Sequence, residues 1–369
     1  MILLFLFVFF VTVELFYYLF FFARLHFLKN EFLSDNQPPI SVIICAKNES
    51  ENLLNNLPLF FNQKYPEFEI VIVDDCSVDD TYDILKAYEA NHANLKIVTL
   101  RESERFEGGK KFALTMGIKA SKHEFLLFTD ADCTPKSENW IAEFAKRFTE
   151  NKEIVLGYSG YQKTKGFLNK LIRFDAFFIG LQYLSYALAK TPYMGVGRNM
   201  AYTKTLFFKN KGFSKHQHIV SGDDDLFVNQ TANSHNTVIV TSTDSQTISP
   251  AKTTFLSWNN QKKRHLTTGK FYKLKHTLLL SAFFFSKLGV LVFFAINLSL
   301  LNLTEIVGAI FVFRMIIQLL IFYKPMKMLG ESDLLPFSPL FDVILLFIYP
   351  FFVVSNIIFK PAKWKRNLN

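Results

Sequence analysis

Cysteine is scarce in this chain, and its spacing suits neither of the structural roles that cysteine commonly serves. The 369 residues contain only Cys45, Cys76 and Cys133, and no two of them have Cys-x-x-Cys spacing. An odd number of unpaired cysteines argues against a disulfide framework and against a thiolate metal site. We therefore expect three small buried thiols in a reducing compartment.

Charged side chains are almost absent from the first 22 residues, where Glu14 is the only acidic or basic residue. A run of this length and polarity is long enough to cross a bilayer. A cleavable signal peptide would need a basic segment before the apolar run and a small-residue cleavage site after it, and the sequence has neither. The sequence predicts a retained membrane anchor over residues 1–23.

Three more long apolar runs lie at about residues 278–301, 305–323 and 336–359. Each has about the length of a spanning helix, so residues 276–360 are expected to form a membrane region with two or three hydrophobic segments. The last run contains Pro336, Pro339 and Pro350, which favour a re-entrant or interfacial course for it.

Basic residues border the apolar runs: Arg24 and Lys29, then Lys262, Lys263, Arg264, Lys270, Lys273 and Lys275, then Lys324 and Lys327. Because lysine and arginine accumulate in cytoplasmic loops, residues 38–266 are predicted to lie in the cytoplasm. An interfacial last run would keep Lys360, Lys363, Lys365 and Arg366 on that same side. The net charge of +9 suits an anionic inner leaflet and an anionic substrate better than nucleic acid.

Strand and helix patterns alternate between the apolar ends. Strands are expected at residues 40–45, 68–73, 95–100 and from 125 onward, each followed by a helical pattern. This alternation predicts an α/β fold with a mainly parallel sheet and helices on both faces. Ligands of such sheets bind beyond the carboxyl ends of the strands.

Beyond residue 150 the alternation fades. A further strand is expected over residues 154–161. The helix expected over residues 167–189 can lie along the membrane surface or be a plain core helix.

Polar residues follow the ends of all four predicted strands, as Asn48-Glu49, Asp74-Asp75, Gly109-Lys110 and Asp130-Ala131-Asp132. They should therefore face one crevice. Asp130 and Asp132 are spaced i and i+2, so their carboxylates point to the same side and repel each other unless a cation lies beside them. Hard oxygen ligands suit Mg²⁺ or Mn²⁺ carrying a phosphorylated ligand. For an isolated Asp-x-Asp, the alternative is a surface turn.

Six short motifs occur in order, at residues 42–49 (VIICAKNE), 73–79 (VDDCSVD), 109–110 (GK), 130–132 (DAD), 222–225 (GDDD) and 261–265 (QKKRH). Taken together, this ordered set resembles the family 2 glycosyltransferases, and most closely their membrane-bound, processive-type branch. The resemblance covers about residues 40–265. It implies a GT-A fold, a nucleotide-diphosphate sugar as donor, usually linked to uridine, and inversion of the anomeric carbon.

The resemblance also assigns expected roles to single residues. Those for the nucleotide sugar are Ala46, Asn48, Glu49, Asp74, Asp75, Lys110, Asp130, Gln261 and Arg264. Lys110 would lie near the diphosphate, and Arg264 can pair with phosphate oxygens. Asp132, assisted by Asp130, would hold the Mg²⁺ or Mn²⁺ ion. Lys111 is expected to be a solvated surface charge.

The catalytic base of the resembled family lies in a Glu-Asp motif, which aligns with Asp223 here. Gly222 stands where glutamate is usual, and three consecutive acids leave Asp224 as the alternative base. An acidic cluster at a helix N-terminus is the structural alternative for this stretch.

The last motif departs from Gln-x-x-Arg-Trp, because His265 replaces the tryptophan. The loss of the indole removes a stacking platform for a growing polymer and favours transfer of one or a few sugars. Trp258 lies nearby in the sequence, but proximity alone does not make it a substitute.

The sequence thus predicts a multi-pass, metal-dependent inverting glycosyltransferase of the cell (inner) membrane, whose acceptor is a membrane-associated lipid or glycan, such as a polyprenyl-phosphate-linked glycan or another lipid. Nucleic acid is not expected as a partner. Two alternatives remain open, a processive polysaccharide synthase and a catalytically silent membrane scaffold. Buried acids without a ligand would be a standing cost to a scaffold, which argues against the second.

Overall fold

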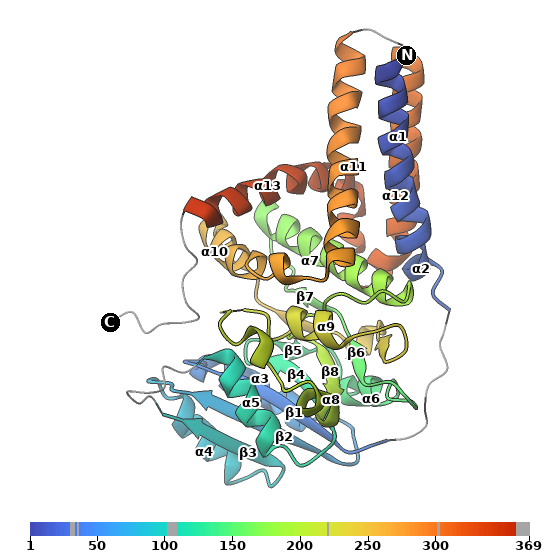
Figure 1. The fold of residues 1–369 in the computed structure, drawn as a ribbon. Helices are drawn as coiled ribbons and strands as arrows, with labels where there is room; N and C mark the ends of the chain where they lie inside the picture. The colour runs from blue at the N-terminus through green and yellow to red at the C-terminus, as the bar shows by residue number, and fades with distance from the viewer. Residues whose placement is uncertain (30–33, 35–36, 102–108, 220, 301–302, 359–369) are drawn as a thin grey trace.

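The computed structural model describes residues 1–29, 34, 37–101, 109–219, 221–300 and 303–358. A sheet-centred unit lies at one end of the molecule, and long helices rise from the other end (Figure 1). Helices α7 (Phe167–Leu188) and α10 (Phe255–Leu266) lie between these two parts.

The main sheet has seven strands in the order β3-β2-β1-β4-β8-β6-β9. Their bounds are Leu95–Leu100, Phe68–Asp75, Ile40–Ala46, Phe125–Asp130, Met200–Thr203, Ile154–Leu156 and Thr237–Ile239, in that spatial order. The first four are parallel, and β8 is antiparallel to both of its neighbours. The mainly parallel sheet that the sequence predicts is therefore confirmed, with one reversed strand inside it.

Helices cover both faces of the sheet because its central strands are buried on both sides. Val42 and Ile44 contribute to a core with α3 (Ser50–Phe61), α4 (Thr81–Glu89) and α6 (Trp140–Ala145). Ile43 contributes to the opposite core with α5 (Lys110–Ala120). Gly117 lets α5 approach closely, since a Cβ there would lie 2.9 Å from side-chain atoms of Ile43 and Val73.

Residues 154–161 do not form the single strand that the sequence predicts. They divide into β6 and β7 (Ser159–Tyr161), which belong to different sheets. The chain leaves the main sheet at Gly157, whose N–H bonds to the carbonyl of Asn199 at 3.0 Å. The Asn199 side chain then donates to the carbonyl of Tyr158 at 2.7 Å, which fixes the bend.

A small second sheet has the order β5-β10-β7 and accounts for another departure. The helix that the sequence predicts after the fourth strand does not begin at once, because residues 134–135 form β5 (Thr134–Pro135), which pairs with β10 (Thr247–Ser249). Helix α6 begins later, at Trp140. The shorter elements of the unit are α8 (Lys204–Lys209), α9 (Asp225–Thr231) and 3₁₀ turns at Ser214–His216, Thr243–Ser245 and Gly269–Phe271.

Four helices in the described part of the chain are long and apolar enough to cross a membrane, which indicates a membrane protein. The first runs over Ile2–His26, as α1 (Ile2–Phe16), a π-helical stretch (Tyr17–Phe22) and α2 (Ala23–His26). The others are α11 (Leu274–Ser299), α12 (Thr304–Met328) and Ser332–Ile358, which comprises a 3₁₀ stretch and α13 (Ser338–Ile358).

These apolar helices do not all run in the same direction. Helices α1, α11 and α12 lie alongside one another, whereas α13 lies across the base of this bundle, close to α7 and α10 (Figure 1). A re-entrant or interfacial course for this apolar run stays a prediction. The basic residues Lys360, Lys363, Lys365 and Arg366 lie outside the described residues.

A buried ionic network joins the apolar helices. Arg314 on α12 donates to Glu14 on α1, with 3.0 Å between Nε and Oε2, and its guanidinium lies 3.4 Å from the Asp342 carboxylate on α13. Asp342 also pairs with Lys287 on α11, and Tyr18 donates to Glu14 at 2.7 Å. Two acids and two bases balance each other, as charges in an apolar setting must.

Helix α7 resolves the two alternatives that its sequence leaves open, because it is an interior helix. Fourteen of its 22 residues are buried, and it packs between the sheet and the apolar helices. The charges that interrupt its apolar pattern are paired: Arg173 Nε donates to Glu331 at 2.9 Å, and Asp175 pairs with Lys262 on α10. Tyr349 on α13 also donates to Asp175, at 2.5 Å.

Candidate active site

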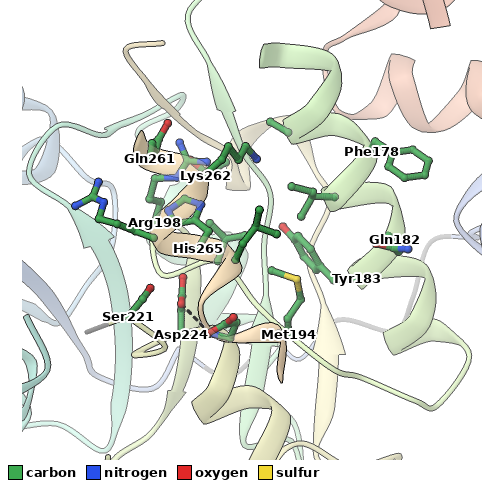
Figure 2. A pocket seen from close by; sticks show the side chains of 18 of the residues that line it. Phe178, Gln182, Tyr183, Met194, Arg198, Ser221, Asp224, Gln261, Lys262 and His265 are labelled. Carbon is green, nitrogen blue, oxygen red and sulfur yellow. Dashed lines mark hydrogen bonds between the residues drawn. The ribbon is translucent and has the colours of Figure 1, made fainter. Parts of the chain in front are cut away.

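A cavity of about 730 Å³ opens beyond the carboxyl ends of β1 and β4, where the sheet topology places a ligand. Eight of the predicted site residues line it: Glu49, Lys110, Asp130, Asp132, Asp223, Asp224, Gln261 and Arg264. Acids and bases separated by more than 200 residues in the sequence therefore share one hollow. In Figure 2, Asp224 lies at the lower end of this cavity, and His265, Arg198 and Gln261 lie above Asp224 on the same side of the cavity.

The remaining four predicted residues, Ala46, Asn48, Asp74 and Asp75, lie beside the cavity but are not part of its lining. Asn48 and Asp74 hold the loop after β2, because the Val78 N–H donates to Asn48 Oδ1 at 2.9 Å and the Ser77 N–H donates to Asp74 Oδ1 at 3.2 Å. Asp75 accepts from the N–H of Gly109 at 3.1 Å.

Lys110 links two acids that come from distant parts of the chain. Its Nζ lies 2.9 Å from Asp130 Oδ1, at the end of β4, and 3.3 Å from Asp223 Oδ2. Burial disfavours the ammonium form, but the carboxylates of Asp130, Asp223 and Asp224 outweigh it and hold the pKa of Lys110 well above its usual value. Lys110 therefore remains a cation between the two sides of the cavity.

Asp130 and Asp132 provide two hard oxygen donors at the end of β4. Burial and the neighbouring charge of Asp130 raise the pKa of Asp132, while Arg198 acts in the opposite direction. Over the residues that the structure describes, no group of three or more His, Cys, Asp or Glu side chains is arranged to hold a metal ion. Two carboxylates nevertheless fit Mg²⁺ or Mn²⁺, which take one or two protein carboxylates and complete their shell with substrate phosphates and water.

The three consecutive acids have three different environments. Asp224 caps α9, because its Oδ1 accepts from the N–H of Asp225 and its Oδ2 from the N–H of Gly197, both at 2.8 Å. Asp225 accepts from the hydroxyls of Thr268 and Tyr272. Asp223, in contrast, faces Lys110 across the cavity.

The helix-cap alternative thus applies to Asp224, whereas Asp223 is the acid that pairs with Lys110 in the cavity. The backbone conformation and the lack of space at position 222 explain why glycine replaces the usual glutamate of the motif. The φ of Gly222, 97°, lies in a region that side-chain-bearing residues rarely adopt, and a Cβ there would lie 2.5 Å from Leu226.

Helix α10 supplies Gln261, Arg264 and His265 to the cavity. Burial lowers the pKa of Arg264, and the charge of Asp130 partly offsets this. The His265 ring lies deep in the molecule but is open to the cavity. Burial, together with the nearby cations of Lys262 and Arg264, holds the pKa of His265 well below its usual value, so its imidazole is neutral.

Trp258 does not replace the indole that His265 displaces. Its side chain is fully buried and packs against Phe352 of α13, with ring centroids 5.2 Å apart. It is absent from the lining of the cavity.

The prediction that Lys111 is a solvated surface charge is wrong. Its side chain is buried, and its Nζ donates to the carbonyls of His216 at 2.6 Å and Ile219 at 2.8 Å. Burial lowers the pKa of Lys111 to about 8. Both acceptors lie more than 100 residues away in the sequence, so no local pattern could have indicated this role.

Arg198 is a cavity residue that the sequence motifs did not assign. It follows the glycine-rich turn at residues 195–197, donates to Ser249 Oγ at 2.5 Å and lies over the Tyr161 ring at 4.5 Å. The turn itself was the only available signal. A Cβ at Gly197 would lie 3.3 Å from the Cβ of Asp224, so glycine leaves room for the hydrogen bond from its N–H to the Asp224 carboxylate.

Comparisons with known proteins agree with this geometry. Residues 41–209 match the family model described as Glycosyl transferase family 2. The chain is 35% identical over 111 residues to poly-beta-1,6-N-acetyl-D-glucosamine synthase of Staphylococcus epidermidis, which is 30% of this chain and 25% of the relative. It is 28% identical over 132 residues to UDP-Glc:alpha-D-GlcNAc-diphosphoundecaprenol beta-1,3-glucosyltransferase WfaP of Escherichia coli, which is 35% of this chain and 48% of WfaP. Both matches span less than half of the relative's length.

Among solved structures, mannosyltransferase PcManGT from Pyrobaculum calidifontis, in complex with GDP-Man and Mn²⁺, is similar over 92% of this chain and 97% of that chain. The TM-score is 0.58 and the sequence identity 18%, so the likeness concerns the fold. The chain therefore carries a glycosyltransferase domain of the GT-A fold. Residues 41–209 of this domain match the family 2 glycosyltransferase model, as the ordered motifs predict.

The burial of Asp224 leads to a pH-dependent prediction. Burial, with the charges of Asp223 and Asp225, raises the pKa of Asp224 from 3.8 to about 7, so the folded protein retains a proton that the unfolded chain releases above pH 4. The contribution of this group to the free energy of unfolding therefore falls as the pH rises from about 4 to about 7. Above pH 7 the destabilisation by the buried carboxylate has reached its full size. The free energy of unfolding of Asp224→Asn, relative to that of wild type, should be higher at pH 8 than at pH 5 by roughly 1–3 kcal/mol.

Thermal unfolding of the detergent-solubilised protein between pH 5 and pH 8 measures this difference. Asp244→Asn, at an exposed position, is the control for the loss of one carboxylate. A difference between wild type and Asp224→Asn that is the same at every pH would contradict the prediction.

Proposed function

We propose that the protein transfers a sugar from a nucleoside-diphosphate donor to an acceptor held at the membrane, with inversion at the anomeric carbon. The observation that carries this proposal is the convergence of Asp130, Asp132, Lys110 and Asp223 on one cavity. A uridine-linked donor is supported by the name of WfaP, whose donor is UDP-Glc. The relatives share only part of their length with this chain, so the sugar and the acceptor are assigned as proposals.

The donor's diphosphate would lie among Lys110, Arg264 and Arg198, three cations that line the cavity together with the Asp130 and Asp132 carboxylates. Gln261, on the same helix as Arg264, lies within reach of the donor. The nucleoside is assigned to Ala46, Asn48, Glu49, Asp74 and Asp75 at the ends of β1 and β2. Because these residues fix the two loops to each other, they would preform that side of the site.

Asp132, with Asp130, would hold Mg²⁺ or Mn²⁺ there, and this ion would supply Lewis-acid stabilisation of the departing diphosphate. The Mn²⁺ in the PcManGT complex supports this assignment. Lys110 and Arg264 belong to the chain itself and would share the same negative charge.

Asp223 is proposed as the general base. The acceptor hydroxyl oxygen forms a bond to C1 of the sugar, the bond from C1 to the phosphate oxygen breaks, and the nucleoside diphosphate leaves with that electron pair. The hydroxyl proton passes to Asp223. Its carboxylate lies 3.3 Å from the Lys110 ammonium and lines the cavity that the acceptor would enter.

Transfer of one or a few sugars is favoured over long-polymer synthesis. A neutral imidazole, His265, takes the place of the stacking indole, and Trp258 packs on α13 instead of lining the cavity. Helix α13 also lies across the base of the bundle, which leaves α1, α11 and α12 as the helices that run together away from the sheet (Figure 1).

Replacement of the base should separate catalysis from donor binding. Asp223→Asn is expected to lower sugar transfer by about 10²- to 10⁴-fold, since a carboxamide cannot accept the proton. Asp224→Asn should have a smaller effect, because both Asp224 oxygens already accept backbone N–H groups. Transfer is measured with radiolabelled sugar and total membrane lipid, and donor binding by competition with a fluorescent nucleotide. A larger loss in Asp224→Asn would move the base to Asp224.

Metal dependence should appear in binding as well as in turnover. With Mn²⁺ present, Asp132→Ala is expected to weaken the binding of nucleoside diphosphate at least tenfold, and a chelator should reproduce this in wild type. Isothermal titration measures the affinity, and the exposed Asp244→Ala is the control. Binding and turnover indifferent to both changes would overturn the metal assignment. Lack of turnover with every donor and lipid fraction would instead favour the scaffold.

The sheet-centred unit, residues 38–266, is proposed to lie in the cytoplasm. Residues 1–23 are proposed as the membrane anchor and residues 276–360 as the C-terminal membrane region. The basic residues at the inner ends of the apolar helices support this orientation. Proteolysis of right-side-out and inverted inner-membrane vesicles tests it. Cleavage within residues 163–166, an exposed loop, should occur only in inverted vesicles.

A further inference from the structure

Part of the cavity lies outside the region proposed for the donor, the metal ion and the base. Beyond the acids and bases it continues between α7, α11 and α13, whose lining residues include six large apolar side chains: Phe178, Ile179, Leu280, Phe284, Leu345 and Leu346. We call this space the acceptor chamber. Figure 2 shows Phe178 on α7, across the cavity from Arg198 and Gln261.

The charges that border the acceptor chamber are already neutralised. Lys262 pairs with Asp175, and Lys287 pairs with Asp342. The Lys287 ammonium also lies 4.7 Å from the centre of the Phe178 ring. Because both lysines have carboxylate partners, this half of the cavity suits a hydrocarbon better than an anion.

The walls of the acceptor chamber are helices whose outer faces are exposed and apolar. On α11, Leu278 is 60% exposed and Phe285 58%, and on α13, Phe347 is 59% exposed. Exposed apolar surface on this scale indicates contact with lipid. The chamber thus lies between the hydrocarbon of the bilayer and the proposed base.

We propose that the acceptor is a membrane lipid, whose hydrocarbon chain occupies the acceptor chamber while a hydroxyl of its head group reaches Asp223. This inference rests on the function proposed above and narrows its acceptor. A nucleophilic hydroxyl needs the base that Asp223 provides, whereas a phosphate monoester is already ionised and needs none.

Two kinds of lipid share this chemistry, namely an acylglycerol with a free hydroxyl and a polyprenyl-linked sugar. The hydroxyl oxygen of either would bond to C1 of the donor sugar, its proton would pass to Asp223, and the nucleoside diphosphate would leave. The product is the glycosylated lipid.

The experiment uses the full chain in nanodiscs with radiolabelled donor and four separate acceptors: dioleoylglycerol, polyprenyl-diphosphate-linked N-acetylglucosamine, polyprenyl phosphate and soluble oligosaccharides. Leu280→Trp narrows the acceptor chamber, and Leu278→Trp places the same indole two residues away on the exposed face of α11. We expect label to enter the organic phase with one of the first two acceptors. Leu280→Trp should reduce this at least tenfold, and Leu278→Trp by less than about twofold.

The acceptor that takes the label identifies the kind of lipid. Labelling of polyprenyl phosphate or of the soluble oligosaccharides alone would overturn the inference, as would unchanged lipid labelling in Leu280→Trp. Binding of a fluorescent nucleotide shows that each variant is folded. Leu280→Ala widens the acceptor chamber, so it should retain lipid labelling if Leu280→Trp acts by blocking the chamber. Wild-type protein that neither binds nor hydrolyses any donor would count against the proposed function itself.

Discussion

The site depends on one ammonium group held between two carboxylates. Lys110 lies at the start of α5, directly after Gly109, whose N–H is fixed by Asp75. From there its Nζ contacts Asp130 from the central sheet and Asp223 from the stretch before α9. Without a cation between them, these two carboxylates would repel each other. The same contact therefore holds the proposed metal side and the proposed base side of the reaction in a fixed relation.

The second constraint is the connection between the sheet and the apolar helices. Helix α7 provides it through charges that its sequence places among aromatic residues. Arg173 pairs with Glu331, which follows α12, and Asp175 binds both Lys262 of α10 and Tyr349 of α13. Each pair joins a segment near the cavity to a segment near the bilayer. Because these charges are buried, loss of one partner would leave the other unpaired at a cost of several kcal/mol, roughly 3–5. The position of α13 over the cavity is thereby tied to the helix that carries Arg264.

Sequence patterns predicted the features that depend on local order. Strand-helix alternation located β1 to β4, and the polar residues that follow these strands lie where a parallel sheet requires, which is why Glu49, Asp130 and Asp132 line one cavity. Prediction failed where a distant partner decides the outcome. The burial of Lys111 depends on two carbonyls near residue 218, and the break between β6 and β7 depends on Asn199. Periodicity carries no information about such partners.

By itself, the sequence determined the order of strands and helices, the apolar ends and the set of acids and bases, because each of these follows from the polarity and spacing of neighbouring residues. Only the tertiary structure distinguished the three acids at residues 223–225. One faces Lys110, one caps α9 and one binds Thr268 and Tyr272. Only the packing of α7, α11 and α13 formed the apolar half of the cavity. The physical reason is the same in both cases: the environment of a side chain is set by atoms that the fold brings to it from far along the chain.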